Sequence, residues 1–293
     1  MNEDGRSTRE LANAIFYLGN LEVSWKEDVS EERKKRILQG IDKSWLWNAR
    51  DISNILYGLG KMRVLWETMN EDTKRILLSG IERKSVEMNE RDISNILYSM
   101  ATIKVSWDTV PVEVKNALYR AIESNLLFMK EFGFNSTIYG LEKMGVSVKE
   151  VPDSVKAVLE SALKKIAKIQ QPSHRITTLI YQLTKMGYSW QSFCEETQEL
   201  LAEMILKSVK EFSPQDLSTT MFSIAIMMKN YDIVCKKNYF IDLQIAIIKK
   251  EYELKNGEEK IVFANEGKHQ VNVYFSWLQS LPPAVLNELR KGL

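Results

Sequence analysis

Short polar side chains recur in this 293-residue chain as adjacent pairs that could hydrogen-bond to nucleobases. The pairs are Ser53-Asn54, Ser94-Asn95 and Asn135-Ser136. One such pair per unit is what base-reading helical repeats use. Asn and Ser near a helix start also bond to backbone groups, or link neighbouring repeats. The sequence favours this packing interpretation, and base reading stays the alternative.

Basic residues stand toward the end of the same segments, where they could hold phosphates. They are Lys61, Arg63, Lys104, Lys143 and Lys185. In a column along one edge they would face the backbone of a nucleic-acid strand. Cations near a helix C-terminus also interact favourably with the helix dipole, by about 0.3–1 kcal/mol each. The two interpretations fit these residues equally well.

Aromatic residues mark each unit twice. The first set, here called the aromatic anchors, comprises Phe16, Tyr57, Tyr98, Tyr139, Tyr181 and Phe222. The second set comprises Trp25, Trp66, Trp107 and Trp190. Exposed aromatics could stack on bases. Large aromatics at a fixed repeat position more often pack between repeats, so we expect both sets to be buried.

Signatures of catalysis are missing from the sequence. Histidine occurs only at His174 and His269, which leaves no visible metal cluster or histidine-based triad. Gly58-Leu-Gly60 lies inside an expected helix and lacks the strand that precedes a dinucleotide-binding turn. Cys194 and Cys235 fall in different repeats, which indicates a reducing compartment, an organelle matrix or cytosol. We expect a non-catalytic protein without cofactor or metal.

The charge balance does not by itself indicate nucleic-acid binding. Lys plus Arg total 40 and Asp plus Glu total 39, a net charge of +1. Phosphate binding usually leaves a basic surplus, although one basic stripe can lie on a neutral protein. The chain is 44% hydrophobic and 27% charged, which is typical of a globular core. No apolar run is long enough to span a bilayer, so we expect no membrane partner.

The elements that position these residues follow from a period. The aromatic anchors are separated by 41, 41, 41, 42 and 41 residues, and a fixed period of this size marks a solenoid of supersecondary units. Apolar residues five and one before each anchor, and two and five after it, predict a first helix. A second helix is expected through Ile37–Ile41 and its copies. The sequence therefore predicts an all-α, right-handed α-solenoid of helix-turn-helix repeats.

Local signals predict where the first helices start and end. Asp51 and Asp92 precede the apolar run, and Ser213-Pro214 places a capping residue before a proline at the first helical position. Gly145 and Gly187 follow two of these helices, where glycine adopts a left-handed conformation at little cost.

The sequence divides into a flexible start (1–8), six repeats (9–250) and a C-terminal insertion with capping helices (251–293). Within 250–263, Asn256-Gly257 predicts a short hairpin. Alternatively, the preceding helix extends to Lys255 and ends on that dipeptide, which the helical spacing up to Leu254 favours. The next matching segment centres on Tyr274, 52 residues after Phe222. A short last helix is expected from Ala284 to Arg290.

Two segments carry a family resemblance, Leu11–Phe16 (Leu-Ala-Asn-Ala-Ile-Phe) and Ser53–Met62 (Ser-Asn-Ile-Leu-Tyr-Gly-Leu-Gly-Lys-Met). They resemble the core pattern of octotricopeptide-type repeats, although the period here is longer than in that family. The resemblance implies an α-solenoid and a role in organellar RNA processing. Similar longer repeats occur in effector proteins of intracellular and plant-associated bacteria, which would imply a host protein target in the host cytosol.

The functional prediction is a module that binds single-stranded RNA along the face of the first helices. The residues expected to approach bases are Ser53, Asn54, Ser94, Asn95, Asn135 and Ser136; those expected to hold phosphates are Lys61, Arg63, Lys104, Lys143 and Lys185. The alternative is a protein-interaction scaffold. Carboxylates that neutralise the lysines, Glu142 among them, would favour the scaffold.

Overall fold

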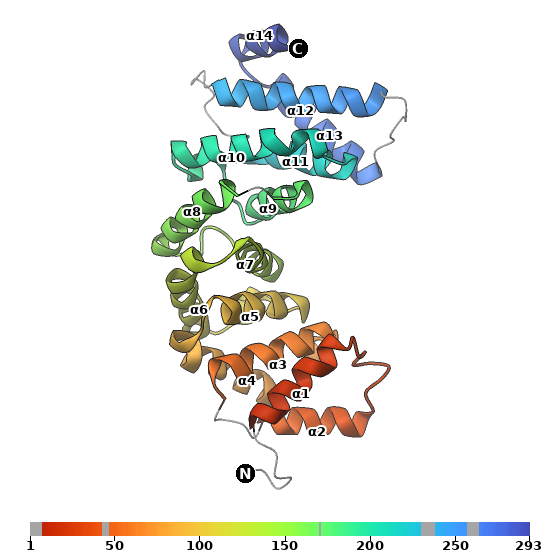
Figure 1. The fold of residues 1–293 in the computed structure, drawn as a ribbon, viewed down its shortest axis with the longest axis vertical. Coiled ribbons are helices and arrows are strands. Elements are labelled where there is room, and N and C mark those ends of the chain that lie inside the picture. Colours follow the sequence, from red (N-terminus) through yellow and green to blue (C-terminus); the bar gives the residue numbers. More distant parts are fainter. Residues whose placement is uncertain (1–7, 43–46, 170, 230–237, 257–263) are drawn as a thin grey trace. The chain divides into compact units, whose positions relative to one another are not determined.

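The structure is a computed structural model that describes residues 8–42, 47–169, 171–229, 238–256 and 264–293 (Figure 1). Every regular element within these ranges is a helix. The chain divides into two compact units, Met1–Ala162 and Leu163–Leu293, and the boundary falls inside one helix. Each unit is described by itself.

The first unit is a row of helical hairpins. The first helix of each hairpin, here called the A helix, is α1 (Thr8–Asn20), α3 (Ala49–Lys61), α5 (Glu90–Thr102) or α7 (Glu131–Met144). The second, here called the B helix, is α2 (Glu31–Asp42), α4 (Glu71–Lys84), α6 (Val112–Asn125) or α8 (Asp153–Ala167), which spans the boundary. The A helices pack on one another in chain order, more extensively than B helices do, so they form one continuous row (Figure 1).

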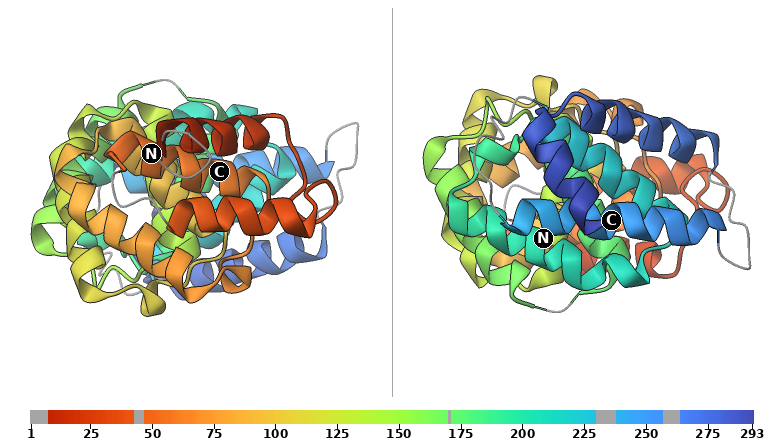
Figure 2. Two further views of the ribbon diagram at one scale, coloured as in Figure 1. Left: turned by 90° about the horizontal axis from the view of Figure 1, so that it is seen from below. Right: turned by 90° about the horizontal axis from the view of Figure 1, so that it is seen from above.

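The second unit repeats this alternation. Its A helices are α9 (Ser173–Lys185), α11 (Pro214–Met227) and α13 (Asn265–Gln279), and its B helices are α10 (Glu195–Ser208), α12 (Asn238–Asn256) and α14 (Pro283–Gly292). A packs on A and B on B, and Figure 2 shows α14 crossing over α12. The all-α class and the stacked hairpins are confirmed, and the handedness stays a prediction.

Short 3₁₀ helices join the elements. Three follow A helices, at Trp66–Thr68, Trp107–Thr109 and Trp190–Ser192; three follow B helices, at Ser85–Glu87, Leu126–Phe128 and Val209–Glu211. The backbone amide of Trp25 donates to the Met62 carbonyl (3.1 Å), and that of Trp66 to the Ile103 carbonyl (2.7 Å). The loop of one repeat is thereby bonded to the end of the next A helix.

The predicted start of two A helices is corrected by the structure. Asn48 and Asn89 are the capping residues, and Asp51 and Asp92 lie three residues inside the helix boundary. Each Asn side chain accepts a bond from the Asp amide, and each Asp carboxylate accepts one from the Asn amide. This reciprocal capping box satisfies two backbone donors. The prediction for Ser213-Pro214 is confirmed.

The ends of five A helices share one backbone motif. Gly145 (φ 89°) and Gly187 (φ 87°) adopt the predicted left-handed conformation. The same repeat position holds Glu22 (φ 55°), Arg63 (φ 59°) and Lys104 (φ 65°). In each copy the following amide bonds to a carbonyl five residues earlier, the signature of a Schellman motif. Three copies therefore place a residue with a Cβ where glycine is preferred.

The C-terminal region follows the extended-helix alternative. The helix α12 continues to Asn256, and α14 covers the expected last helix. The hairpin alternative depends on residues 257–263, which lie outside the described residues. Residues 1–7 of the predicted flexible start also lie outside them.

Candidate nucleic-acid interface

One side of every A helix remains accessible. It carries the aromatic anchor, the residues seven and three positions before it, and the residue four after it. Steps of four, three and four keep these residues on one side of a helix. In the first unit the four positions hold Arg9, Asn13, Phe16 and Asn20; Arg50, Asn54, Tyr57 and Lys61; Arg91, Asn95, Tyr98 and Thr102; and Phe132, Ser136, Tyr139 and Lys143. None of these residues is fully buried. We call this surface the A-helix stripe.

The second unit has the same stripe with fewer charges. In α9 and α11 these positions hold His174, Thr178, Tyr181 and Lys185, then Gln215, Thr219, Phe222 and Ile226, of which Thr219 is buried. In α13 the half-buried aromatic is Phe275, with Lys268 and Asn272 before it. Tyr274, the residue matched by sequence, is fully buried and donates to Gln244 (2.5 Å). The structural match therefore lies one residue further along the chain.

The prediction that the aromatic anchors are buried was wrong. All six are at least partly accessible, and Tyr98 is 37% exposed. An A helix buries its flanks against neighbouring A helices and its back against a B helix, so the fourth side faces solvent. Ring centroids lie 5.4 Å apart in Phe16–Tyr57 and in Tyr98–Tyr139. The anchors form aromatic pairs on the surface.

Glycines set the spacing of these pairs. A Cβ built on Gly58 would lie 2.3 Å from the Ile15 carbonyl oxygen, and one on Gly140 would lie 2.6 Å from that of Leu97. Both glycines directly follow the second ring of a close pair. Serine follows Phe222, whose ring lies 6.5 Å from that of Tyr181. Close approach of two A helices therefore accompanies the tighter ring pairs.

The structure divides each predicted polar pair. Asn54, Asn95 and Ser136 lie half-buried on the stripe. Ser53 and Ser94 are buried, and Ser94 donates to the Arg91 carbonyl (3.1 Å). Asn135 lies half-buried beside the stripe.

The asparagines combine both interpretations of the polar pairs. Asn54 Nδ2 donates to Asn13 Oδ1 across two repeats (3.4 Å). Both side chains are nevertheless only half-buried, so they remain within reach of a ligand.

The predicted basic residues fall into two registers. Lys61, Lys143 and Lys185 lie on the stripe, whereas Arg63 and Lys104 occupy the left-handed position beyond the helix end. The Lys143 and Lys185 ammonium groups lie 5.8 Å and 6.0 Å from the rings of Tyr139 and Tyr181, as in cation–π contacts.

One of these cations is neutralised by a carboxylate. Lys143 Nζ lies 3.2 Å from Glu142 Oε2, and the Glu142 side chain is 8% exposed. Within the described part of the chain, Lys61, Lys185, Arg63 and Lys104 form no ion pair. Pairing of the predicted cations with carboxylates would favour a protein partner over RNA. Among the described residues one of these cations is paired and four are not, so this criterion favours neither ligand.

Sequence reasoning missed the arginines of the stripe. Arg9, Arg50 and Arg91 are exposed and stand 41 residues apart, a spacing that was visible in the sequence. A groove of about 410 Å³ crosses α1, α3 and α5 and is lined by Arg50, Arg91 and the stripe asparagines Asn13, Asn54 and Asn95. Guanidinium groups beside half-buried amides and rings provide phosphate, base-edge and stacking contacts in one place.

Two carboxylates also line this groove. Asp92 caps its own helix through Asn89, and Glu90 is exposed. Burial raises the pKa of the Asp92 carboxyl, while the Asn89 backbone bond and then the Arg50 charge act in the opposite direction. Arg50 therefore interacts electrostatically with a carboxylate of the next repeat.

The tryptophans behave as two groups. Trp107 and Trp190 are buried, as predicted. Trp25 and Trp66 are only half-buried, and each lines a groove on the B-helix side of the first unit.

Within the described ranges no group of His, Cys, Asp and Glu side chains could hold a metal ion. No described helix has both the length and the hydropathy needed to cross a bilayer.

Comparison with known proteins leaves the chain without an assigned family. No family model matches it, and no curated protein matches it. Among twenty matching solved chains is the crystal structure of an engineered protein from the Northeast Structural Genomics Consortium. It is 14% identical, and the alignment covers 92% of this chain and 97% of that one with a TM-score of 0.27. A score this low carries no argument, so the repeat architecture rests on the helix order and packing.

Proposed function

We propose that the chain is a non-catalytic helical-repeat module that binds single-stranded RNA along the A-helix stripe. The observation that carries the proposal is the set of accessible Arg, Asn, aromatic and Lys side chains at matching positions of successive A helices. Separate helices supply one set each, so the contacts continue in one direction, as an extended strand requires.

Each side-chain type has a role in this proposal. Arg9, Arg50 and Arg91 bind phosphates through planar forks, and Lys61 adds a point charge. Asn54 and its counterparts hydrogen-bond to base edges. The accessible anchor rings stack on unpaired bases, a contact worth about 1–3 kcal/mol per base. Stacking on ring faces requires splayed bases, which favours a single strand over a duplex.

A protein partner is the second candidate. The Glu142–Lys143 ion pair and the net charge of +1 favour it, because both reduce the field that attracts a polyanion. RNA, by contrast, would gain most of its binding free energy from the first unit, where the stripe arginines lie.

The test is binding of a fluorescent, mixed-sequence single-stranded RNA by the full chain across a salt series. For single strands the slope of log K against log salt is negative, and each lost phosphate contact makes it shallower by about 0.7. The triple variant Arg9→Ala/Arg50→Ala/Arg91→Ala should therefore lose a slope of about 2. Tyr57→Ala should weaken binding with little change in slope, because stacking releases no counterions.

The matched control removes three exposed arginines from B helices, Arg36→Ala/Arg83→Ala/Arg120→Ala. It changes the net charge equally, so RNA binding on the stripe predicts a much smaller effect. Equal losses in both triple variants would indicate unspecific attraction. No binding at low salt would overturn the RNA proposal and favour the protein scaffold.

A further inference from the structure

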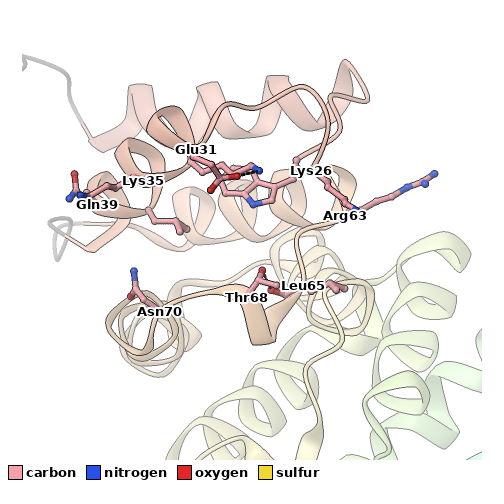
Figure 3. A pocket seen from close by; sticks show the side chains of 11 residues that line it. Lys26, Glu31, Lys35, Gln39, Arg63, Leu65, Thr68 and Asn70 are labelled. Carbon is pink, nitrogen blue, oxygen red and sulfur yellow. Dashed lines mark hydrogen bonds and ion pairs between the residues drawn. The ribbon is translucent and has the colours of Figure 1, made fainter.

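A second groove lies on the B-helix side of the first unit, between the first two repeats. Its volume is about 650 Å³, and none of its lining residues belongs to the A-helix stripe. Figure 3 shows Lys35 and Gln39 on one wall and Thr68 and Asn70 on the opposite wall. The walls come from α2 and from the loop that leads into α4.

This groove is strongly basic. Lys26, Lys34, Lys35 and Arg63 line it, against one carboxylate, Glu31. Lys34 pairs with Glu31 (2.6 Å). Among the described residues the other three cations have no ion-pair partner. Three positive charges are therefore available to a ligand.

Part of the lining of the groove is apolar. Trp25, Leu38 and Leu65 are half-buried and contribute to the lining. Apolar surface left half-exposed in a concave site gains free energy when a ligand covers it. The site therefore suits a ligand that has both a bulky apolar group and negative charges.

The neighbouring repeat provides an internal comparison. The next groove, of about 540 Å³, is built by the same elements one repeat later around Trp66 and Leu78. Glu67 stands there in the place of Lys26, and Glu71 and Glu82 also line it, against two cations. The architecture is common to both grooves, whereas the positive charge belongs to the first alone.

We propose that the first groove binds an acidic peptide segment of a partner protein. A bulky apolar side chain of the peptide packs on Trp25, and flanking carboxylates pair with Lys26, Lys35 and Arg63. The side chains of Gln39, Thr68 and Asn70 can hydrogen-bond to the peptide backbone. This site is independent of RNA binding on the stripe.

The lining favours a peptide over nucleic acid. Arginine forks bind phosphates in a bidentate manner that lysines cannot, whereas lysines prevail here and Arg63 points outward at one end of the groove (Figure 3). A single half-buried tryptophan beside two leucines accommodates an apolar side chain better than a series of stacked bases.

The test selects ligands for the full chain from a random peptide library and titrates an enriched peptide by fluorescence anisotropy. The wild type should enrich Asp and Glu around a large apolar residue. Lys26→Glu/Lys35→Glu, which gives the first groove the charge type of the second, should weaken the enriched peptide by at least about tenfold. The matched control Lys74→Glu/Arg75→Glu makes the same charge change in the second groove and should bind normally. Circular dichroism verifies that both variants fold.

Three results of the peptide measurements would overturn the proposal. They are a selection without acidic enrichment, equal affinity of the wild type and Lys26→Glu/Lys35→Glu, and equal weakening by both double variants. Labelled single-stranded RNA is titrated in parallel. If Lys26→Glu/Lys35→Glu loses RNA as strongly as the stripe triple variant does, the groove belongs to a nucleic-acid path and the peptide proposal fails.

Discussion

At the residue scale, the left-handed position after each A helix shows how a repeat tolerates a local cost. Arg63 and Lys104 adopt positive φ angles, where an L residue loses about 1–2 kcal/mol to contact between Cβ and the carbonyl. The Schellman bonds and the packed next residue hold them there. Gly145 and Gly187 adopt the same conformation without that cost.

Replacing Lys104 by glycine should therefore stabilise the protein. At φ 65° the contact between Cβ and the carbonyl costs more free energy than glycine loses through the greater entropy of the unfolded chain. We therefore expect Lys104→Gly to raise the free energy of unfolding by about 0.5–1 kcal/mol. Urea denaturation measures the change. Lys104→Ala removes the same charge but keeps the Cβ, and it should give no comparable gain. If both variants gain equally, backbone strain is not the cause.

The reverse change tests the same position from the other side. No atom lies within 4 Å of a Cβ built on Gly145, so Gly145→Ala meets only the backbone cost of φ 89°. We expect a loss of about 1 kcal/mol in the free energy of unfolding. Neutral behaviour in the same urea series would show that this copy of the motif relaxes.

The raised pKa of Tyr119 predicts that the stability of the fold depends on pH at the alkaline end. Its side chain is buried against Trp107, and burial followed by the charge of Glu150 raises its pKa to about 12. In the unfolded chain a tyrosine titrates near pH 10. Between about pH 10 and 12 the unfolded state alone loses this proton, so stability present below pH 10 falls as the pH rises.

The variant Tyr119→Phe should remove part of that fall. The difference amounts to about 2–3 kcal/mol at pH 12, and urea denaturation at a series of pH values measures it. Some decline remains, because burial also raises the pKa of Tyr274. An unaltered decline in Tyr119→Phe would contradict the assignment.

At the element scale, the close approach of α5 and α7 depends on Gly140. A Cβ there would lie 2.6 Å from the Leu97 carbonyl carbon and oxygen, which are backbone atoms of a packed helix. The two helices must separate to admit it, so we expect Gly140→Ala to lower the free energy of unfolding by about 2–3 kcal/mol. Thermal and urea unfolding measure the loss.

Gly133 in the same helix is the matched control. The nearest atoms to its Cβ belong to the flexible Met129 side chain at 3.7 Å, an ordinary contact. Gly133→Ala should therefore gain up to about 1 kcal/mol from helix propensity. A similar loss in both variants would show that helix packing is not what Gly140 serves.

The elements were largely predictable, because apolar positions at fixed spacing recur in every copy. The accessible side was misread, because half-buried rings and core rings occupy the same apolar class in a sequence. Phe16 and Tyr57 have the spacing of core residues, and only the packing of A on A shows which side stays open. The arginines at 9, 50 and 91 were a usable signal, since their period equals that of the anchors.

The helix ends were predictable only where the residue type states the conformation. Glycine at 145 and 187 indicated a left-handed turn, whereas Arg63 and Lys104 gave no such sign. Their conformation follows from alignment with the glycines, which stand at the same repeat position. The start signals at Asp51 and Asp92 lie three residues after the true caps for a similar reason, because aspartate is preferred both at the cap and inside the first turn.

At the scale of the whole molecule, the 41-residue period determines which helices pack together and does not determine the charge that each repeat carries. Within each unit every A helix packs on the next A helix, so the stability of a unit is close to a sum of local terms and neighbour interfaces. The charge of the stripe, by contrast, changes along the chain. The arginines are confined to the first unit, while α9 and α11 carry His174 and Gln215 in their place.

Local coupling predicts how a defect spreads. A Cβ on Gly58 would lie 2.3 Å from the Ile15 carbonyl oxygen, so Gly58→Ala should weaken the α1–α3 interface. Because the second unit is compact by itself, we expect amide protection in hydrogen–deuterium exchange to fall in α1 and α3 while α9 and α11 keep theirs. Gly133→Ala, with ordinary contacts, should leave both units protected. Uniform loss of protection along the chain in Gly58→Ala would show instead that the two units unfold as one cooperative body.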